Sequence, residues 1–131
     1  MKVIVCGPVA YGNIQRIKGL QNFLRQNGFK VVDQFQQGMD YSDVKDFRDK
    51  RELAVSIVKN DLYNIKNCDV MVAICDQPSF GTAVEIYYAK KLGKKIVVFS
   101  EKSVASPWPI AFSDYIVKSR EELVKVLSEI I

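Results

Sequence analysis

Five short apolar runs recur along the chain, and most of the segments between them keep helical spacing. The runs cover residues 2–6, 29–32, 69–75, 95–100 and 115–118. Runs of this length, rich in Val and Ile and bounded by Gly, Pro or polar residues, predict strands that are buried on both faces. Strands that alternate with helices pair in parallel, because a right-handed helical crossover returns the chain to the same end of the sheet.

The predicted helices run from about 14 to 27, 46 to 67, 81 to 92 and 119 to 131. Ser119 and Glu122 form a capping box for the last of them. No helix is predicted between the fourth and fifth strands. This order predicts a protein of the α/β class, with a flavodoxin-like (Rossmann-like) doubly wound sheet of five parallel strands and helices on both faces.

The length of 131 residues fits one domain, residues 1–131. The apolar runs are too short for a signal segment or a membrane span, so we expect a cytoplasmic protein with no membrane partner. Cys6, Cys68 and Cys75 are odd in number and form no C-x-x-C pair, which favours a reducing compartment and no disulfide.

The chain contains no histidine, which excludes His-based triads, His general bases and His metal sites. Acid–base chemistry therefore falls to carboxylates, and we expect neither a metal nor a cofactor. The formal charge is +4, but Lys and Arg are interleaved with Asp and Glu. Residues 90–95, "KKLGKK", fall at a predicted helix C-terminus, where cations are favoured. We therefore expect no nucleic-acid partner.

Ligands of doubly wound sheets bind beyond the carboxyl ends of the strands, where segments 7–13, 76–82 and 101–112 are expected. The long polar connection at 34–46 is also a candidate for function. In the first segment, Gly7 and Gly12 could let a ligand approach the backbone, and Tyr11 could stack or hydrogen-bond. The segment is neither G-x-G-x-x-G nor Walker A, and an ordinary Gly-Pro turn explains it equally well.

In the second segment, Ser79 and the N–H groups of residues 80–82, including Gly81, would lie at a helix N-terminus. Such a site favours an anion or sugar hydroxyls. Glu85 falls in the first helical turn or just past it. It is either a reagent or a residue that compensates the helix dipole, an effect of about 0.3 to 1 kcal/mol. Its position alone does not separate the two interpretations.

A second carboxylate, Asp61, lies near the end of the helix that leads into the third strand. Asp76, at the end of that strand, is a further candidate and is expected among the substrate contacts. The alternative for Asp61 is a solvated helix residue, and the alternative for Asp76 is a turn former. Two carboxylates in one crevice suit attack at an anomeric carbon, with one of them forming a covalent glycosyl ester.

Residues 60–98, "NDLYNIKNCDVMVAICDQPSFGTAVEIYYAKKLGKKIVV", resemble the core of the nucleoside 2-deoxyribosyltransferase superfamily, with its N-D, a-D-v-v-a and G-x-x-x-E-x-x-x-A motifs. The "QPSFG" stretch is most similar to the 2'-deoxynucleoside 5'-phosphate N-hydrolase branch. The resemblance implies that Glu85 attacks C1' of the sugar, that Asp61 orients it, and that Ser79 contacts a 5'-phosphate. It also implies that Ser106 of a neighbouring subunit reaches the same phosphate site, and hence at least a homodimer.

The first loop departs from the pattern of this branch. Pro8 replaces a serine, Ala10 and Asn13 replace arginines, and the tyrosine expected near Ile4 or Val5 is absent. We nevertheless expect Asn13 among the substrate contacts. A phosphate would then need another cation, and the nearest in sequence are Arg16 and Lys18.

The resemblance predicts hydrolysis of the base–sugar bond of a (deoxy)nucleoside 5'-monophosphate through a covalent Glu85 intermediate. The alternatives are transfer of deoxyribose between bases and an inactive nucleotide-binding module. A phosphoribohydrolase of the lysine-decarboxylase-like family is a weaker match, because "PSFGTAVE" shares only its Gly-Thr and Glu. The expected partners are a small nucleotide or nucleoside and a second copy of the chain.

Overall fold

The computed structural model describes all 131 residues, from Met1 to Ile131. Its strands are β1 (Lys2–Cys6), β2 (Lys30–Val31), β3 (Val70–Ile74), β4 (Lys95–Phe99) and β5 (Tyr115–Val117). They form one sheet in the order β2-β1-β3-β4-β5, and every pair is parallel. This confirms the predicted flavodoxin-like sheet, although β2 is shorter than predicted.

The three central strands end in step. Cys6 of β1 pairs with Ala73 of β3, and Ile74 of β3 pairs with Phe99 of β4. Every residue of β3 is buried, as expected for an apolar strand covered on both faces. The loops that leave β1, β3 and β4 therefore meet at one edge of the sheet, which we call the carboxyl edge.

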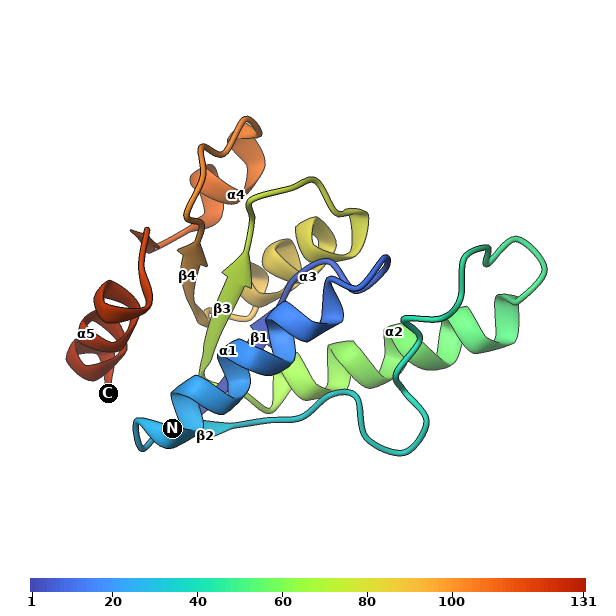
Figure 1. Cartoon of the computed structure of the whole chain (residues 1–131), viewed down its shortest axis with the longest axis horizontal. Helices are drawn as coiled ribbons and strands as arrows, with labels where there is room; N and C mark the ends of the chain where they lie inside the picture. Colours follow the sequence, from blue (N-terminus) through green and yellow to red (C-terminus); the bar gives the residue numbers. More distant parts are fainter.

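The helices are α1 (Ile14–Gln26), α2 (Arg51–Lys66), α3 (Phe80–Lys91), α4 (Pro107–Phe112) and α5 (Arg120–Ile130). Side chains from α1 and α5 form one hydrophobic core with Val3 and Val5. Those from α2 and α3 form a second core with Ile4 and Cys6. Alternate residues of a strand point to opposite faces, so the sheet is covered on both sides (Figure 1).

The prediction that α2 starts near Asp46 is wrong, because the helix begins at Arg51. The Asp46 carboxylate accepts hydrogen bonds from the backbone N–H of Arg48 at 2.9 Å and from its guanidinium at 2.8 Å. An Asp side chain that binds the backbone two residues on stabilises a turn rather than a helix. The first part of α2, with the connection before it, extends beyond the sheet (Figure 1).

The short helix α4 is not among the predicted elements. Its N-cap is Ser106, whose Oγ accepts from the N–H of Trp108 at 3.4 Å, and Pro107 takes the first helical position. A Ser-Pro pair is a typical helix start, because proline lacks the N–H that this position leaves unpaired. The sequence carried this signal, and α4 packs against α3.

The predicted capping box at the start of α5 is half confirmed. Ser119 Oγ accepts from the N–H of Glu122 at 3.1 Å, but the Glu122 carboxylate accepts from Lys118 N–H at 2.8 Å rather than from Ser119. The three cysteines are buried and carry free thiols. None of the helices is both long enough and apolar enough to cross a membrane.

Candidate active site

The two carboxylates singled out in the sequence come from neighbouring helices. Asp61 lies near the end of α2 and Glu85 in the middle of α3, and these helices pack against each other. Both side chains are half-buried, and neither has a cation partner. Burial, and then the negative charge of Asp61, raises the pKa of Glu85 to about 8. Burial raises the pKa of Asp61 to about 6, although a hydrogen bond from Asn60 opposes this.

Glu85 is not a helix cap. It lies in the second turn of α3, and the first turn contains no acidic residue. The cap is Ser79, whose Oγ accepts from the N–H of Thr82 at 3.3 Å and from its hydroxyl at 3.0 Å. Because dipole effects fall off within the first turn, the geometry favours the interpretation of Glu85 as a reagent.

The N-terminus of α3 is open to a ligand. The N–H groups of Phe80 and Gly81 have no hydrogen-bond partner, as is usual for the first residues of a helix. A Cβ at Gly81 would meet nothing within 4 Å, so packing does not require glycine there. The Ser79 hydroxyl accepts two hydrogen bonds and keeps its own proton to donate. These groups form a compact set of donors for an anion or for hydroxyls.

A buried network of hydrogen bonds holds Asn60, the residue before Asp61. Its neighbour Asn60 donates to the carbonyl of Gln34 at 2.7 Å, and Gln34 donates to the carbonyl of Val5 at 2.7 Å. Gln21 of α1 donates to Gln34 Oε1 at 3.1 Å. The network joins β1, α1 and α2. Sequence reasoning missed it, although Gln21 occupies an apolar position in the helical pattern of α1, which was an available signal.

Tyr41 is a second residue that sequence reasoning missed, although it lies in the connection expected to be functional. Its ring is half-buried and stands edge-on to Phe47, with 5.9 Å between ring centroids. Burial, and then the charges of Asp61 and Glu85, raises the pKa of Tyr41. The phenol therefore stays protonated beside the two carboxylates and can donate a hydrogen bond.

The loop after β1 serves packing and carries strain. A Cβ on Gly7 would lie 3.1 Å from Cβ of Ile74, so glycine lets β1 and β3 end close together. Tyr11 has φ +57°, which is rare for an aromatic residue, and its side chain is 84% exposed. Gly12 follows at φ +82° with open space around it. Strain of this kind is frequent at binding sites.

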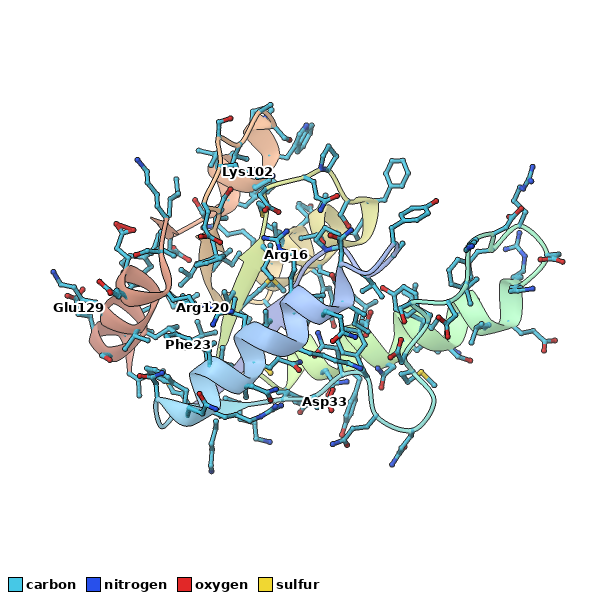
Figure 2. All side chains as sticks on the ribbon, in the orientation of Figure 1. Arg16, Phe23, Asp33, Lys102, Arg120 and Glu129 are labelled. Atoms are coloured by element: carbon cyan, nitrogen blue, oxygen red, sulfur yellow. The ribbon has the colours of Figure 1, made fainter.

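The same loop is tied to the loop after β3. Arg16 forms a bidentate ion pair with Asp76, at 2.7 and 2.6 Å, and Gln77 donates to Asn13 Oδ1 at 2.9 Å. The hydrogen bond from Arg16 is the main reason that the pKa of Asp76 is lowered. An open cleft of about 690 Å³ lies here, lined by Asn13, Arg16, Asp76, Gln77, Glu101 and Lys102. Figure 2 shows Arg16 and Lys102 at this edge.

Of the two cations that could replace the missing arginines, neither is free. Arg16 holds Asp76, and Lys18 lies 3.1 Å from the Asp40 carboxylate. Ser106 caps α4 on the loop after β4 and is half-buried. No three Cys, Asp or Glu side chains converge closely enough to hold a metal ion.

These features define an α/β domain with a carboxylate-based candidate active site at the switch point of its sheet. A sequence model of the family described as nucleoside 2-deoxyribosyltransferase matches residues 5–126. The chain belongs to this family. Comparison with curated proteins gives no match.

Solved structures of low sequence identity share the fold. A 2-deoxyribosyltransferase from Bacillus psychrosaccharolyticus superposes with a TM-score of 0.76 at 20% identity, over 95% of this chain and 90% of that one. The CMP N-glycosidase BcmB from Clostridium botulinum gives 0.58 at 22% identity over the whole of both chains. A conserved protein from Enterococcus faecalis V583 gives 0.71 at 18% identity, over 100% and 99%.

Proposed function

We propose that the protein cleaves the N-glycosidic bond of a small nucleotide or nucleoside at the pair formed by Asp61 and Glu85. The observation that carries this proposal is the pair itself: two half-buried carboxylates without a cation, one of them with its pKa raised to about 8. Carboxylates whose pKa values are raised by burial and by a neighbouring charge are typical of catalytic groups. The family and the two enzymes named in the structural comparison support the same chemistry.

The chemistry follows from the charge of the pair. With pKa values of about 6 and about 8, it holds close to one proton at pH 7. These values place the proton mainly on Glu85 at pH 7, so the reactive arrangement requires its transfer: Glu85 then carries the negative charge and Asp61 the proton. The Glu85 carboxylate attacks C1', the C–N bond breaks with its electrons on the base, and the base takes up the proton that Asp61 carried. Water then attacks C1' and gives a proton to the Asp61 carboxylate, while the bond from C1' to Glu85 breaks with its electrons on Glu85. The sugar leaves with the hydroxyl, and the pair again holds one proton.

The preferred substrate in this proposal is a (deoxy)nucleoside 5'-monophosphate, with water as the acceptor. The Ser79 hydroxyl and the open N–H groups of Phe80 and Gly81 would bind the phosphate. Tyr11 and Gly12, at the rim of the loop after β1, would contact the rest of the nucleotide. Transfer of deoxyribose to a second base remains the alternative, supported by the likeness to a deoxyribosyltransferase.

We also propose that the chain works as a homodimer, with Ser106 of one copy completing the phosphate site of the other. An apolar surface on α3 and α4 supports this. It includes Phe80, Val84, Tyr87 and Trp108, whose side chains are 97%, 61%, 50% and 65% exposed. Contiguous apolar surfaces of this kind mark association sites. A change of Val84 to Glu should give monomers in sedimentation, and unaltered association would contradict this interface.

Free base released from a panel of nucleosides and their 5'-monophosphates tests the proposed function. We expect release from at least one monophosphate, faster than from the matching nucleoside. The matched variants are Glu85→Gln, which should stop release, and Glu129→Gln on the exposed face of α5, which should not. No release from any compound by the folded wild-type protein would refute catalysis. Thermal shifts with nucleotides but no turnover would instead indicate a binding module.

A further inference from the structure

Two consecutive residues of the loop after β3 hold the start of α1. Arg16 donates from Nη1 to Oδ1 of Asp76 at 2.7 Å, and its Nη2 lies 2.6 Å from Oδ2. Beside this pair, the amide of Gln77 donates to Asn13 Oδ1 at 2.9 Å, and Asn13 donates in turn to the carbonyl of Ala10 at 2.8 Å. We call Asn13, Arg16, Asp76 and Gln77 the loop clamp.

The Arg16–Asp76 pair is not an ordinary surface ion pair. The Asp76 side chain is only 7% exposed, whereas that of Arg16 is 36% exposed. A buried carboxylate that loses its partner is strongly destabilising. Arg16 therefore cannot turn toward a substrate phosphate without leaving Asp76 buried and unpaired. This excludes Arg16 as a ready replacement for the arginines that the loop lacks.

The cleft over the clamp does not favour a phosphate either. Its cations, Arg16 and Lys102, are matched by two anions, Asp76 and Glu101. The lining therefore carries no net charge that would attract a dianion. Its remaining residues are the amides Asn13 and Gln77, which bind each other.

The clamp lies next to the residues that do have open donors. Only Pro78 separates Gln77 from Ser79, the N-cap of α3. Proline fixes its own φ and removes one soft dihedral from this connection. Fixing Asp76 and Gln77 therefore restricts the positions that Ser79 can take. The open N–H groups of Phe80 and Gly81 follow directly after it.

We propose that the loop clamp positions the substrate-binding end of α3, and that Arg16 and Asp76 are positioning residues rather than substrate ligands. This inference rests on the proposed function, because it assigns α3 the contacts to substrate. It adds that the contacts between the start of α1 and the loop after β3 must form before the substrate binds. A displacement of about 1 Å at such a site can cost on the order of a hundredfold in rate.

The test compares Arg16→Met, Asp76→Asn, the double variant, and the exchange Arg16→Asp with Asp76→Arg. Arg48→Met and Asp46→Asn are matched controls, since this Arg–Asp pair is also close, at 2.8 Å, but its side chains are 91% and 52% exposed. For each variant, kcat and KM are measured with one deoxynucleoside and with its 5'-monophosphate. The double variant avoids the buried unpaired charge, so it keeps the test valid if Arg16→Met does not fold.

The clamp predicts a loss of about 10- to 100-fold in kcat/KM for Asp76→Asn and for the double variant, equal on both substrates. The exchange should restore part of the activity, and the controls should match wild type. A loss confined to the monophosphate in Arg16→Met, with a gain in Asp76→Asn, would make Arg16 a phosphate ligand and overturn the proposal. Normal kcat/KM with only a lower Tm would overturn it too.

Hydrogen exchange separates this inference from the proposed function. Without any substrate, amides of residues 76–82 should exchange faster in Asp76→Asn and in the double variant, but not in Asp46→Asn. Unchanged exchange in this segment would overturn the clamp whether or not the protein is an enzyme. Absence of base release from wild type, with faster exchange in the clamp variants, would refute the proposed function alone.

Discussion

At the carboxyl edge of the sheet, the α2–α3 side holds Asp61 and Glu85 without a cation, whereas the α1 side pairs Asp76 with Arg16. The pKa values follow this difference. They are raised to about 6 for Asp61 and about 8 for Glu85, and lowered for Asp76. All three residues carry the same kind of group, so their surroundings rather than their chemistry decide how their pKa values shift.

The difference separates stability from chemistry. The Asp76 carboxylate is satisfied in the folded protein and stabilises it. The negative charge of Glu85 destabilises the folded protein, because the carboxylate is buried and lies near a second negative charge. A carboxylate that the fold does not stabilise in this way stays reactive. The carboxyl edge thus has a paired side, with Arg16 of α1 and Asp76, and a reactive side, with Asp61 of α2 and Glu85 of α3. The following variants should affect the two sides differently.

The largest effect should come from Glu85→Gln, which keeps the shape of the side chain and removes its nucleophilic oxygen. Base release should fall by about a thousandfold or more, because the covalent step is lost. The measurement is free base by chromatography, with the circular dichroism spectrum as the check on folding. Turnover near the wild-type rate would remove Glu85 from the proposed mechanism.

Asp61→Asn should have the next largest effect and a characteristic pH profile. In wild type, kcat/KM should rise with pH through about 6 and fall through about 8, because the reactive pair holds one proton. The neutral amide of the variant can neither hold that proton nor raise the pKa of Glu85. We therefore expect a loss of about a hundredfold and a profile that rises as Glu85 ionises, with a pKa that burial still keeps raised, and then stays level. A variant profile that still falls near pH 8 would contradict this role.

The sequence predicted the elements that have local signals. Apolar runs located β1, β3 and β4, and the helix predicted from Gly81 to Leu92 matches the start of α3 at Phe80 within one residue. The start of α2 and the helix α4 were not predicted, although both have local sequence signals. An Asp turn precedes α2, but the apolar spacing favoured an earlier helix start. A Ser-Pro pair begins α4, and this signal was not used.

The parts of the site that could not be predicted depend on contacts between distant residues. The Arg16–Asp76 pair spans 60 positions, and the hydrogen bond from Asn60 to the Gln34 carbonyl spans 26. Spacing along one element carries no information about such pairs. Asp61 and Glu85 could be singled out because each belongs to a motif, whereas their charge states depend on burial that only the fold creates.

Glu85 and Asp76 should change the free energy of unfolding with pH in opposite directions. The pKa of Glu85 is raised from 4.5 to about 8, so the folded state binds the extra proton between these values. Wild type should therefore lose stability relative to Glu85→Gln as pH rises from about 4.5 to about 8, by at most about 1.4 kcal/mol per pH unit. Urea midpoints across this range measure the effect. A constant difference would mean that Glu85 titrates normally.

Asp76→Asn provides the opposite case. Because the pKa of Asp76 is lowered from 3.8 in the folded protein, its charge contributes stability above that value and loses it as pH falls through the folded pKa. The variant should be less stable than wild type by about 1 to 3 kcal/mol at pH 7, and the difference should disappear in acid. A difference that grows in acid would contradict the pairing with Arg16.

The smallest effect tests whether the reactive side extends to the connection before α2. Tyr41→Phe keeps the ring against Phe47 and removes only the hydroxyl, whose pKa is raised by burial and then by the charges of Asp61 and Glu85. If this O–H donates to the substrate, kcat/KM should fall about tenfold, the usual effect of one neutral hydrogen bond, while Tm stays constant. Tyr63→Phe is the matched control, since Tyr63 also lies near Asp61 in sequence but is 67% exposed. If Tyr41→Phe and Tyr63→Phe are equally active, the reactive side is limited to α2 and α3. A loss of activity in Tyr41→Phe alone would show that the segment before α2 also takes part.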